Sequence, residues 1–138
     1  MSALTAEARI WSLGTYGSNP EVSLIIGGGG AGGTSSDLQL NHLGSATLVT
    51  ASSVNSTGVW AHVAAVRYSG TTTLYVNGIS KGTTASNPWT SSSTSLWIGG
   101  WSQNNNQMNG YIDDFRITKG YARYTSNFTA PTSAFKDK

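Results

Sequence analysis

Acidic residues are the first candidates for chemistry, and the chain has six of them: Glu7, Glu21, Asp37, Asp113, Asp114 and Asp137. Glycoside hydrolysis needs two carboxylates about 5 to 10 Å apart that flank one bond. Asp113 and Asp114 are adjacent in a segment that we expect to be a strand, so their side chains leave on opposite faces. We therefore expect no catalytic pair and no enzymatic activity.

Other reactive residue types lack the partners that catalysis would need. His42 and His62 lie on separate expected strands, and the chain has no cysteine, which excludes thiolate metal and redox sites. No Gly-x-Ser-x-Gly motif stands on a strand, turn and helix pattern. The glycine run 27–33 lacks the Lys-Ser/Thr of a phosphate loop, so we interpret it as a turn.

Tryptophans in polar loops are the best candidates for ligand binding. Trp89 and Trp101 lie in or beside Ser/Asn/Thr/Gln-rich loops, and Asn104, Asn105 and Asn106 follow Trp101. An exposed indole can stack on a sugar ring while amide side chains bind its hydroxyls. The alternative is that the indoles cap the end of the fold or bury against a neighbouring subunit, since oligomer interfaces also favour aromatic residues.

Composition limits the class of protein. A chain of 138 residues is the size of one domain, which we place at 1–138. The net charge is +2, and the basic residues are spread along the chain, so we expect no nucleic-acid partner. No apolar run approaches the roughly 18 residues of a membrane span, and no secretory signal opens the chain. We expect a protein that is made in the cytoplasm.

Strand signals recur at intervals of about ten residues between Gly/Ser/Asn/Thr turns, which predicts an all-β fold. The expected strands are 8–13, 21–27, 37–42, 46–51, 59–68, 72–77, 95–100 and 110–118. Both faces of 59–68 are mostly apolar, so we expect it to be a central strand. Asn77-Gly78 predicts a tight hairpin turn, and we expect a short helical turn at 119–124.

Four segments in a fixed order resemble a known family: Gly58–Arg67, Thr73–Gly78, Ser95–Gly100 and Gly110–Thr132. They resemble the laminin G-like branch of the concanavalin A-like lectins and glucanases, in the variant found in bacteriophage tail and virion proteins. The resemblance runs from about Trp11 to Phe135 and implies an antiparallel β-sandwich, or jelly roll. It also implies an ordinary packed, hydrogen-bonded histidine at His62.

The resemblance implies a weak calcium candidate as well. Asp113 is expected to share a strand face with Tyr111, Phe115 and Ile117 and to point inward. Some relatives bind calcium with loop carboxylates, but calcium takes six to eight oxygens and few carboxylates are available here. The structural alternative is that backbone amides or Arg67 satisfy the Asp113 carboxylate. No other metal or cofactor is expected.

A complete domain of this family opens with a strand pair before the position of Trp11, and only ten residues precede Trp11 here. We expect a shortened jelly roll that other chains complete, in a homo-oligomer such as a trimer or another cyclic assembly, or on a larger particle. The expected function is a non-enzymatic virion protein, as a capsid decoration or a tail, baseplate or fibre component, that contacts cell-surface glycans. The alternative is a free carbohydrate-binding lectin module.

Overall fold

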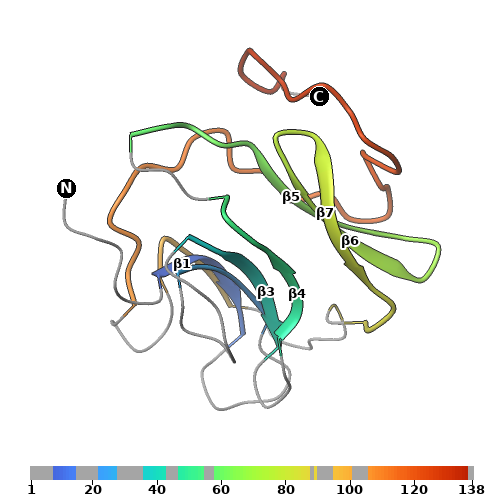
Figure 1. The fold of residues 1–138 in the computed structure, drawn as a ribbon, viewed down its shortest axis with the longest axis horizontal. Helices are drawn as coiled ribbons and strands as arrows, with labels where there is room; N and C mark the ends of the chain where they lie inside the picture. The colour runs from blue at the N-terminus through green and yellow to red at the C-terminus, as the bar shows by residue number, and fades with distance from the viewer. Residues whose placement is uncertain are drawn as a thin grey trace.

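A computed structural model describes residues 8–14, 22–27, 36–42, 47–54, 58–87, 89, 95–100 and 106–136 of the 138-residue chain. They form two antiparallel sheets (Figure 1). The strands are β1 (Ala8–Leu13), β2 (Val22–Ile26), β3 (Leu38–His42), β4 (Thr47–Ala51), β5 (Val63–Tyr68), β6 (Thr71–Val76), β7 (Ile79–Thr84) and β8 (Leu96–Ile98). The described residues contain no helix of the length and apolarity that a membrane span requires.

The larger sheet has the order β4-β3-β2-β1-β8. Its strands follow the period of two that sends successive side chains to opposite faces. In β3, Leu38 and Leu40 are fully buried on one face, and Gln39 and Asn41 leave on the other. The alternation therefore separates this sheet into one apolar face and one polar face.

The smaller sheet has the order β5-β6-β7, and two tight turns connect its strands. Ser69-Gly70 and Asn77-Gly78 both have positive φ angles, with values of 50° and 81° in the second turn. Two successive residues at positive φ give the turn that suits hairpin strands. The predicted Asn77-Gly78 turn is confirmed, and it adds β7, which the polar sequence Ile79–Thr84 did not reveal.

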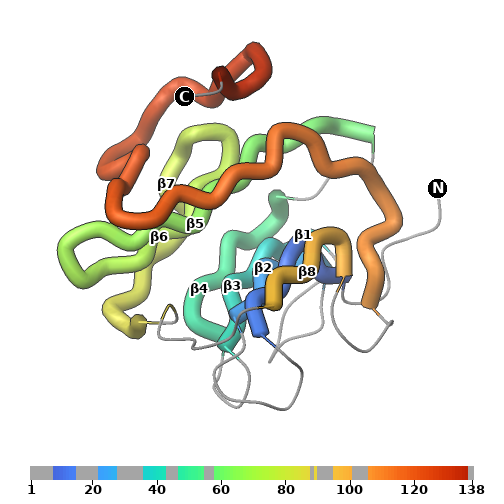
Figure 2. Tube along the Cα trace, turned by 180° about the vertical axis from the view of Figure 1, so that it is seen from behind, coloured from blue at the N-terminus to red at the C-terminus, as the bar shows by residue number. Residues whose placement is uncertain are grey.

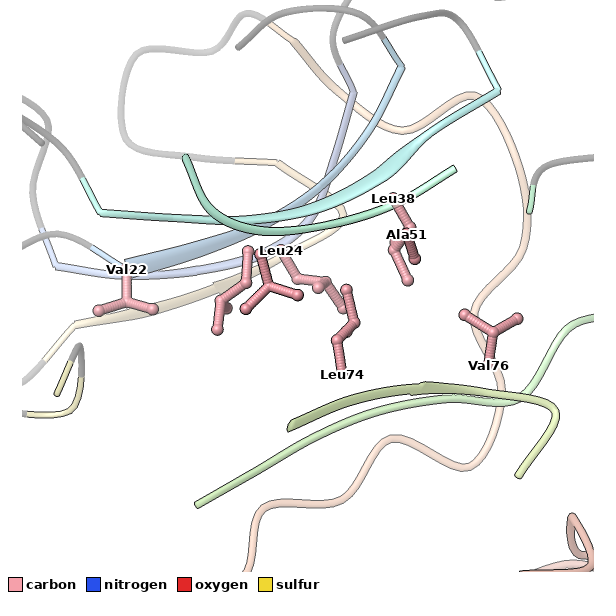
Figure 3. Packing of buried hydrophobic residues seen from close by; sticks show 8 residues of the cluster. Val22, Leu24, Leu38, Ala51, Leu74 and Val76 are labelled. Carbon is pink, nitrogen blue, oxygen red and sulfur yellow. The ribbon is translucent and has the colours of Figure 1, made fainter. Parts of the chain in front are cut away.

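The two sheets stack over a single apolar core. Leu74 and Val76 from β6 face the apolar side of the larger sheet across the interior (Figure 3). The buried members of this core are Val22, Leu24, Leu38, Leu40, Val49, Ala51, Leu74 and Val76. The predicted all-β sandwich is confirmed.

The predicted strand 59–68 is shorter and lies elsewhere than expected. It begins at Val63, and β5 occupies the edge of the smaller sheet instead of its centre. Val59 and Trp60 precede the strand and are 69% and 66% exposed. The apolar residues at the start of the predicted strand therefore do not indicate that β5 is a central strand of its sheet.

The tail from residue 106 onward crosses the smaller sheet without joining it (Figure 2). The predicted strand 110–118 is wrong: Asp114 has a φ of 50°, which interrupts an extended chain. The predicted helical turn at 119–124 is also absent, and Gly120 has a φ of 82°. The alternation of apolar and polar residues in 110–118 was therefore not sufficient for a strand to form.

Candidate functional site

Of the loop residues predicted to bind sugar, Trp89 is half-buried. Its ring stacks on Trp11 with centroids 5.9 Å apart, and its indole Nε1 donates to Thr72 Oγ1 at 3.4 Å. Trp11 lies on the apolar face of the larger sheet, opposite Leu24. The contacts of Trp89 are those of the packing alternative, in which the indole caps the core.

Asn106 is hydrogen-bonded to β1, the strand that contains Trp11. Its carbonyl oxygen accepts a bond from the Arg9 amide at 2.9 Å, and it has a φ of 54°. Trp101, Asn104 and Asn105 lie outside the described residues. The structure thus fixes Trp89 and Asn106 near strand β1, and sugar binding by this loop set stays a prediction.

Asp113, the calcium candidate, is exposed instead of pointing inward. Its carboxylate accepts the backbone N–H of Asp114 at 2.9 Å, and Arg67 instead donates to Thr72 Oγ1 and to the Ser86 carbonyl. A backbone amide therefore satisfies this carboxylate, as one alternative expected, whereas the inward orientation and the Arg67 partnership are wrong, because the segment around Asp113 does not join a sheet. Among the described residues, no three His, Asp or Glu side chains gather as a metal site would require.

His62 is packed, as the resemblance implied. Its ring meets Tyr124, Phe128 and Phe135 edge to face, with centroids 6.0, 5.5 and 6.3 Å away. Burial lowers the pKa of this imidazole, because the charged form loses hydration. Its Nδ1 is buried and has no hydrogen-bond partner in the described part of the chain, so the expected ring hydrogen bond is not seen at that atom. The cluster fastens the tail to the smaller sheet.

The side of the larger sheet that faces away from the core carries the arrangement with most potential for binding. Cross-strand pairing sets the side chains of this polar face in two rows, because residues directly opposite each other share a face. One row comprises Trp97, Ser12, Ser23, Asn41 and Thr47, and the other comprises Arg9, Ile25, Gln39 and Thr50. We call these nine residues the polar face.

A buried network occupies the centre of the polar face. Arg9 is 4% exposed and donates through Nη1 to Ser23 Oγ, which in turn donates to Ser12 Oγ at 3.0 Å. Ser12 and Ser23 are 0% and 2% exposed. These hydrogen bonds link β1 to β2, whereas Arg9 Nε is buried and has no hydrogen-bond partner among the described residues.

Within the part of the chain that the structure describes, three side-chain atoms at the β3–β4 side of the polar face are buried but make no hydrogen bond. They are Gln39 Oε1, Asn41 Oδ1 and Thr47 Oγ1. Leaving a buried polar group unpaired costs about 1 to 3 kcal/mol. Asn41 and Thr47 are themselves partly accessible, and Thr50 beside Gln39 is exposed. Unpaired acceptors next to accessible surface are suited to a ligand that brings hydroxyl donors.

An exposed tryptophan stands at the opposite end of the same row. Trp97 is 39% exposed and pairs with Ser12 across β8 and β1. Between Trp97 and Asn41 the row passes through Ser12 and Ser23, which are buried, so only the two ends of the row are accessible. The polar face therefore offers an indole at one end and amide and hydroxyl groups at the other.

Sequence reasoning did not select Gln39, Asn41, Thr47 or Trp97. A signal was available in the alternation Leu38-Gln-Leu-Asn41, where the second face is polar throughout. That pattern alone is also typical of any solvated strand. Only the pairing of β2, β3 and β4 shows that these polar atoms gather.

The two stacked antiparallel sheets place the protein in the class of β-sandwiches. Its larger sheet has one apolar face toward the core and one polar face. A family model described as the concanavalin A-like lectin/glucanases superfamily matches residues 1–123, and the chain belongs to this family. No curated protein matched.

Among solved structures, the chain is similar to residues 221–444 of an S-layer domain-containing protein from Clostridium thermocellum, with 28% identity and a TM-score of 0.40. The match covers 86% of this chain and 59% of that one, so the chain spans less than two thirds of that structure's length.

Proposed function

We propose that this chain is a non-catalytic carbohydrate-binding domain whose binding surface is the polar face of the larger sheet. The observation that carries the proposal is the group of three buried acceptors, Gln39 Oε1, Asn41 Oδ1 and Thr47 Oγ1, that have no hydrogen-bond partner among the described residues. Sugar hydroxyls are donors of the right kind, and the low charge of the face fits a neutral ligand. Membership of a superfamily of lectins and glucanases supports the same class of ligand.

The non-catalytic part of the proposal rests on the carboxylates. Asp113 and Asp114 are exposed in the tail, and Asp37 is buried and accepts the Ser53 amide at 3.1 Å. None of these three carboxylates belongs to the polar face, whose nine residues include no acidic side chain. An acid and a base flanking a sugar on this face would have to come from elsewhere.

The test is a glycan array followed by calorimetry with the best oligosaccharide found. Thr47→Val removes one hydroxyl at nearly constant shape and is expected to weaken sugar binding about tenfold, which corresponds to 1.4 kcal/mol. Thr83→Val on exposed β7 is the matched control and should bind like the unaltered protein. Equal affinity in both variants would show that the polar face is not the site.

A second candidate function is assembly into a virus particle, as a capsid decoration or tail component. The observation in its favour is the exposed apolar side chains of the tail: Tyr111 is 84% exposed, Ile117 64% and Tyr121 67%. Large apolar side chains in one exposed segment are typical of surfaces that bind other proteins. Mass spectrometry of density-purified particles from cells that encode the chain tests this role, and its absence from such particles would exclude it.

The two candidates are compatible, since a lectin domain can be carried on a particle. Neither requires a metal, and calcium at Asp113 stays a separate prediction. A calcium titration that raises the melting temperature of the protein, but not of Asp113→Asn, would support such a site. Equal behaviour of the two proteins would remove Asp113 from consideration.

A further inference from the structure

Asparagine is followed by glycine at two places in the chain, Asn77-Gly78 and Asn109-Gly110. This dipeptide is prone to deamidation, in which the backbone nitrogen of the second residue attacks the side-chain amide of the first. Glycine favours the attack because it has no side chain to hinder it and leaves the backbone free to adopt the reactive conformation. The reaction needs only water, so its rate at each place depends on how firmly the fold holds the two residues.

The hairpin turn holds Asn77 and Gly78 in one conformation. The Asn77 amide donates to the His62 carbonyl at 2.8 Å, and Asn77 Oδ1 accepts the His62 amide at 2.9 Å. Gly78 is buried, and its carbonyl accepts the Phe128 amide at 2.9 Å, so the tail packs directly over it. For the Gly78 nitrogen to reach the Asn77 side chain, the turn has to open, which costs free energy.

The second dipeptide lies in an open segment. Asn109 and Gly110 are both exposed and lie outside the strands, where the chain leaves the larger sheet and continues as the tail (Figure 2). The backbone hydrogen bond that precedes them runs from the Met108 amide to the Gly99 carbonyl at 2.9 Å. Within the described part of the chain, neither Asn109 nor Gly110 makes a hydrogen bond. The Asn109 side-chain amide and the Gly110 nitrogen are therefore accessible to each other and to water.

We propose that Asn109 is a site of spontaneous deamidation and that the hairpin turn protects Asn77 from the same reaction. The Gly110 nitrogen forms a bond to Asn109 Cγ, and the bond from this carbon to the side-chain nitrogen breaks. Ammonia leaves with the proton that the Gly110 nitrogen gives up, and a succinimide ring remains. Water then opens the ring at either of its two carbonyl groups, which gives aspartate or isoaspartate at this position without any oxidation or reduction.

Deamidation changes the surface charge of the protein. It turns a neutral amide into a carboxylate and so lowers the formal net charge, which is +2 in the unmodified chain. The isoaspartate product also lengthens the backbone by a carbon atom between Met108 and Gly110. Because Asn109 and Gly110 are exposed, the modified protein is expected to keep its fold. Older molecules are therefore expected to carry a more negative surface where the tail begins.

The first experiment follows both sites in the same molecule. The full chain is incubated at mildly alkaline pH in heavy-oxygen water and digested with trypsin, which separates the two sites because Lys81 lies between them. Mass spectrometry then measures how fast each site takes up oxygen from water. We expect Asn109 to react at least about tenfold faster than Asn77, which corresponds to a barrier lower by about 1.4 kcal/mol. Equal rates, or a faster reaction at Asn77, would overturn the proposal.

Unfolding the protein separates the effect of the fold from that of the sequence. In concentrated urea, both asparagines are still followed by glycine, but the hairpin turn no longer holds Asn77. We therefore expect Asn77 to react faster than it does in the folded protein and the difference between the two sites to disappear. A preference for Asn109 that is equally large in urea would show that the turn gives no protection and would contradict the proposal.

Gly110→Ala tests which atom attacks the side chain. The added methyl group lies beside the Gly110 nitrogen and should slow the reaction at Asn109 at least about tenfold. The alanine Cβ would approach only the flexible end of the Met108 side chain, at 3.0 Å, so the variant is expected to fold. Unchanged kinetics in this variant would exclude the Gly110 nitrogen as the nucleophile and overturn the proposal.

Ion-exchange chromatography of aged protein measures the change in charge. The unaltered chain is expected to develop a more acidic form, and Asn109→Gln should develop much less of it, because a longer side chain closes the ring less readily. Asn77→Gly is the matched control, since glycine suits the first position of this turn, and it should age like the unaltered chain. Loss of the acidic form in Asn77→Gly but not in Asn109→Gln would place the reaction in the hairpin turn and overturn the proposal.

Discussion

Asn41 and Thr47 stand directly opposite each other on β3 and β4, and each has a buried polar atom without a hydrogen-bond partner among the described residues. A register shift between Leu40 and Asn41 brings them together, because it sets Thr47 and not Leu48 opposite Asn41. Bulges of this kind redirect side chains and are frequent next to functional sites. The register shift between β3 and β4 therefore places two residues of the proposed binding surface side by side.

Thr47→Val is expected to stabilise the protein while it weakens sugar binding. The unpaired hydroxyl costs about 1 to 3 kcal/mol in the folded state, and the isosteric methyl group removes that cost. Thermal unfolding of the ligand-free protein should show a higher melting temperature by several degrees. A lower melting temperature would mean that Thr47 Oγ1 is hydrogen-bonded in solution.

Gly78→Ala is expected to unfold the turn that holds the tail. A Cβ atom at Gly78 would collide with the Phe128 carbonyl, and its φ of 81° is unfavourable for alanine. Gly70→Ala is the matched control, because Gly70 has a φ of 83° and open space around its Cβ position. The control should lose about 1 kcal/mol from positive φ alone.

Chemical denaturation compares these two glycine variants. We expect Gly78→Ala to lose at least twice as much unfolding free energy as Gly70→Ala, since it adds a collision to the same backbone strain. Equal losses would show that the contact between Gly78 and Phe128 does not persist in solution.

Stability is expected to fall below pH 6.5 because of His62. Burial lowers the pKa of its imidazole from 6.5, so the unfolded state binds more protons as the pH drops below that value. The contribution is complete above pH 6.5 and is lost as the pH falls toward the lower folded-state pKa. His62→Gln should show a shallower pH dependence, with His42 present in both proteins, and an identical dependence would contradict this account.

Trp89→Ala is expected to destabilise the fold more than Trp97→Ala. Removing a core tryptophan costs about 3 to 5 kcal/mol, and we expect about 2 kcal/mol for Trp89, which is half-buried against Trp11. Trp97 stands at the exposed end of the polar face and should cost under about 1 kcal/mol.

Sugar affinity should reverse the order of the two tryptophans. Trp97→Ala is expected to weaken binding more than Trp89→Ala, because only Trp97 lies on the polar face. The sugar affinity of both variants is measured by fluorescence titration with the sugar identified on the array. The titration is done at a temperature where both variants are folded. A greater loss with Trp89→Ala would favour the loop site predicted from sequence.

Strands in the first half of the chain could be predicted closely. The segment 8–13 matches β1, and 37–42 differs from β3 by one residue, since alternation and turn residues both mark these segments. Strand β7 was missed because Ile79–Thr84 is largely polar and has only the preceding Asn77-Gly78 turn to fix its position. The strand expected at 110–118 did not form, since an alternating pattern needs a neighbour with free backbone groups and Asp114 turns the chain.

By itself, the sequence determined the all-β class, the tight turns and the division of each strand into two faces, because these depend on residues that are neighbours along the chain. Tertiary structure decided which polar faces meet, and therefore that Gln39, Asn41 and Thr47 form one surface while Trp89 caps the core. It also decided that β5 lies at an edge. Strand order is set by contacts between distant segments, which local composition does not encode.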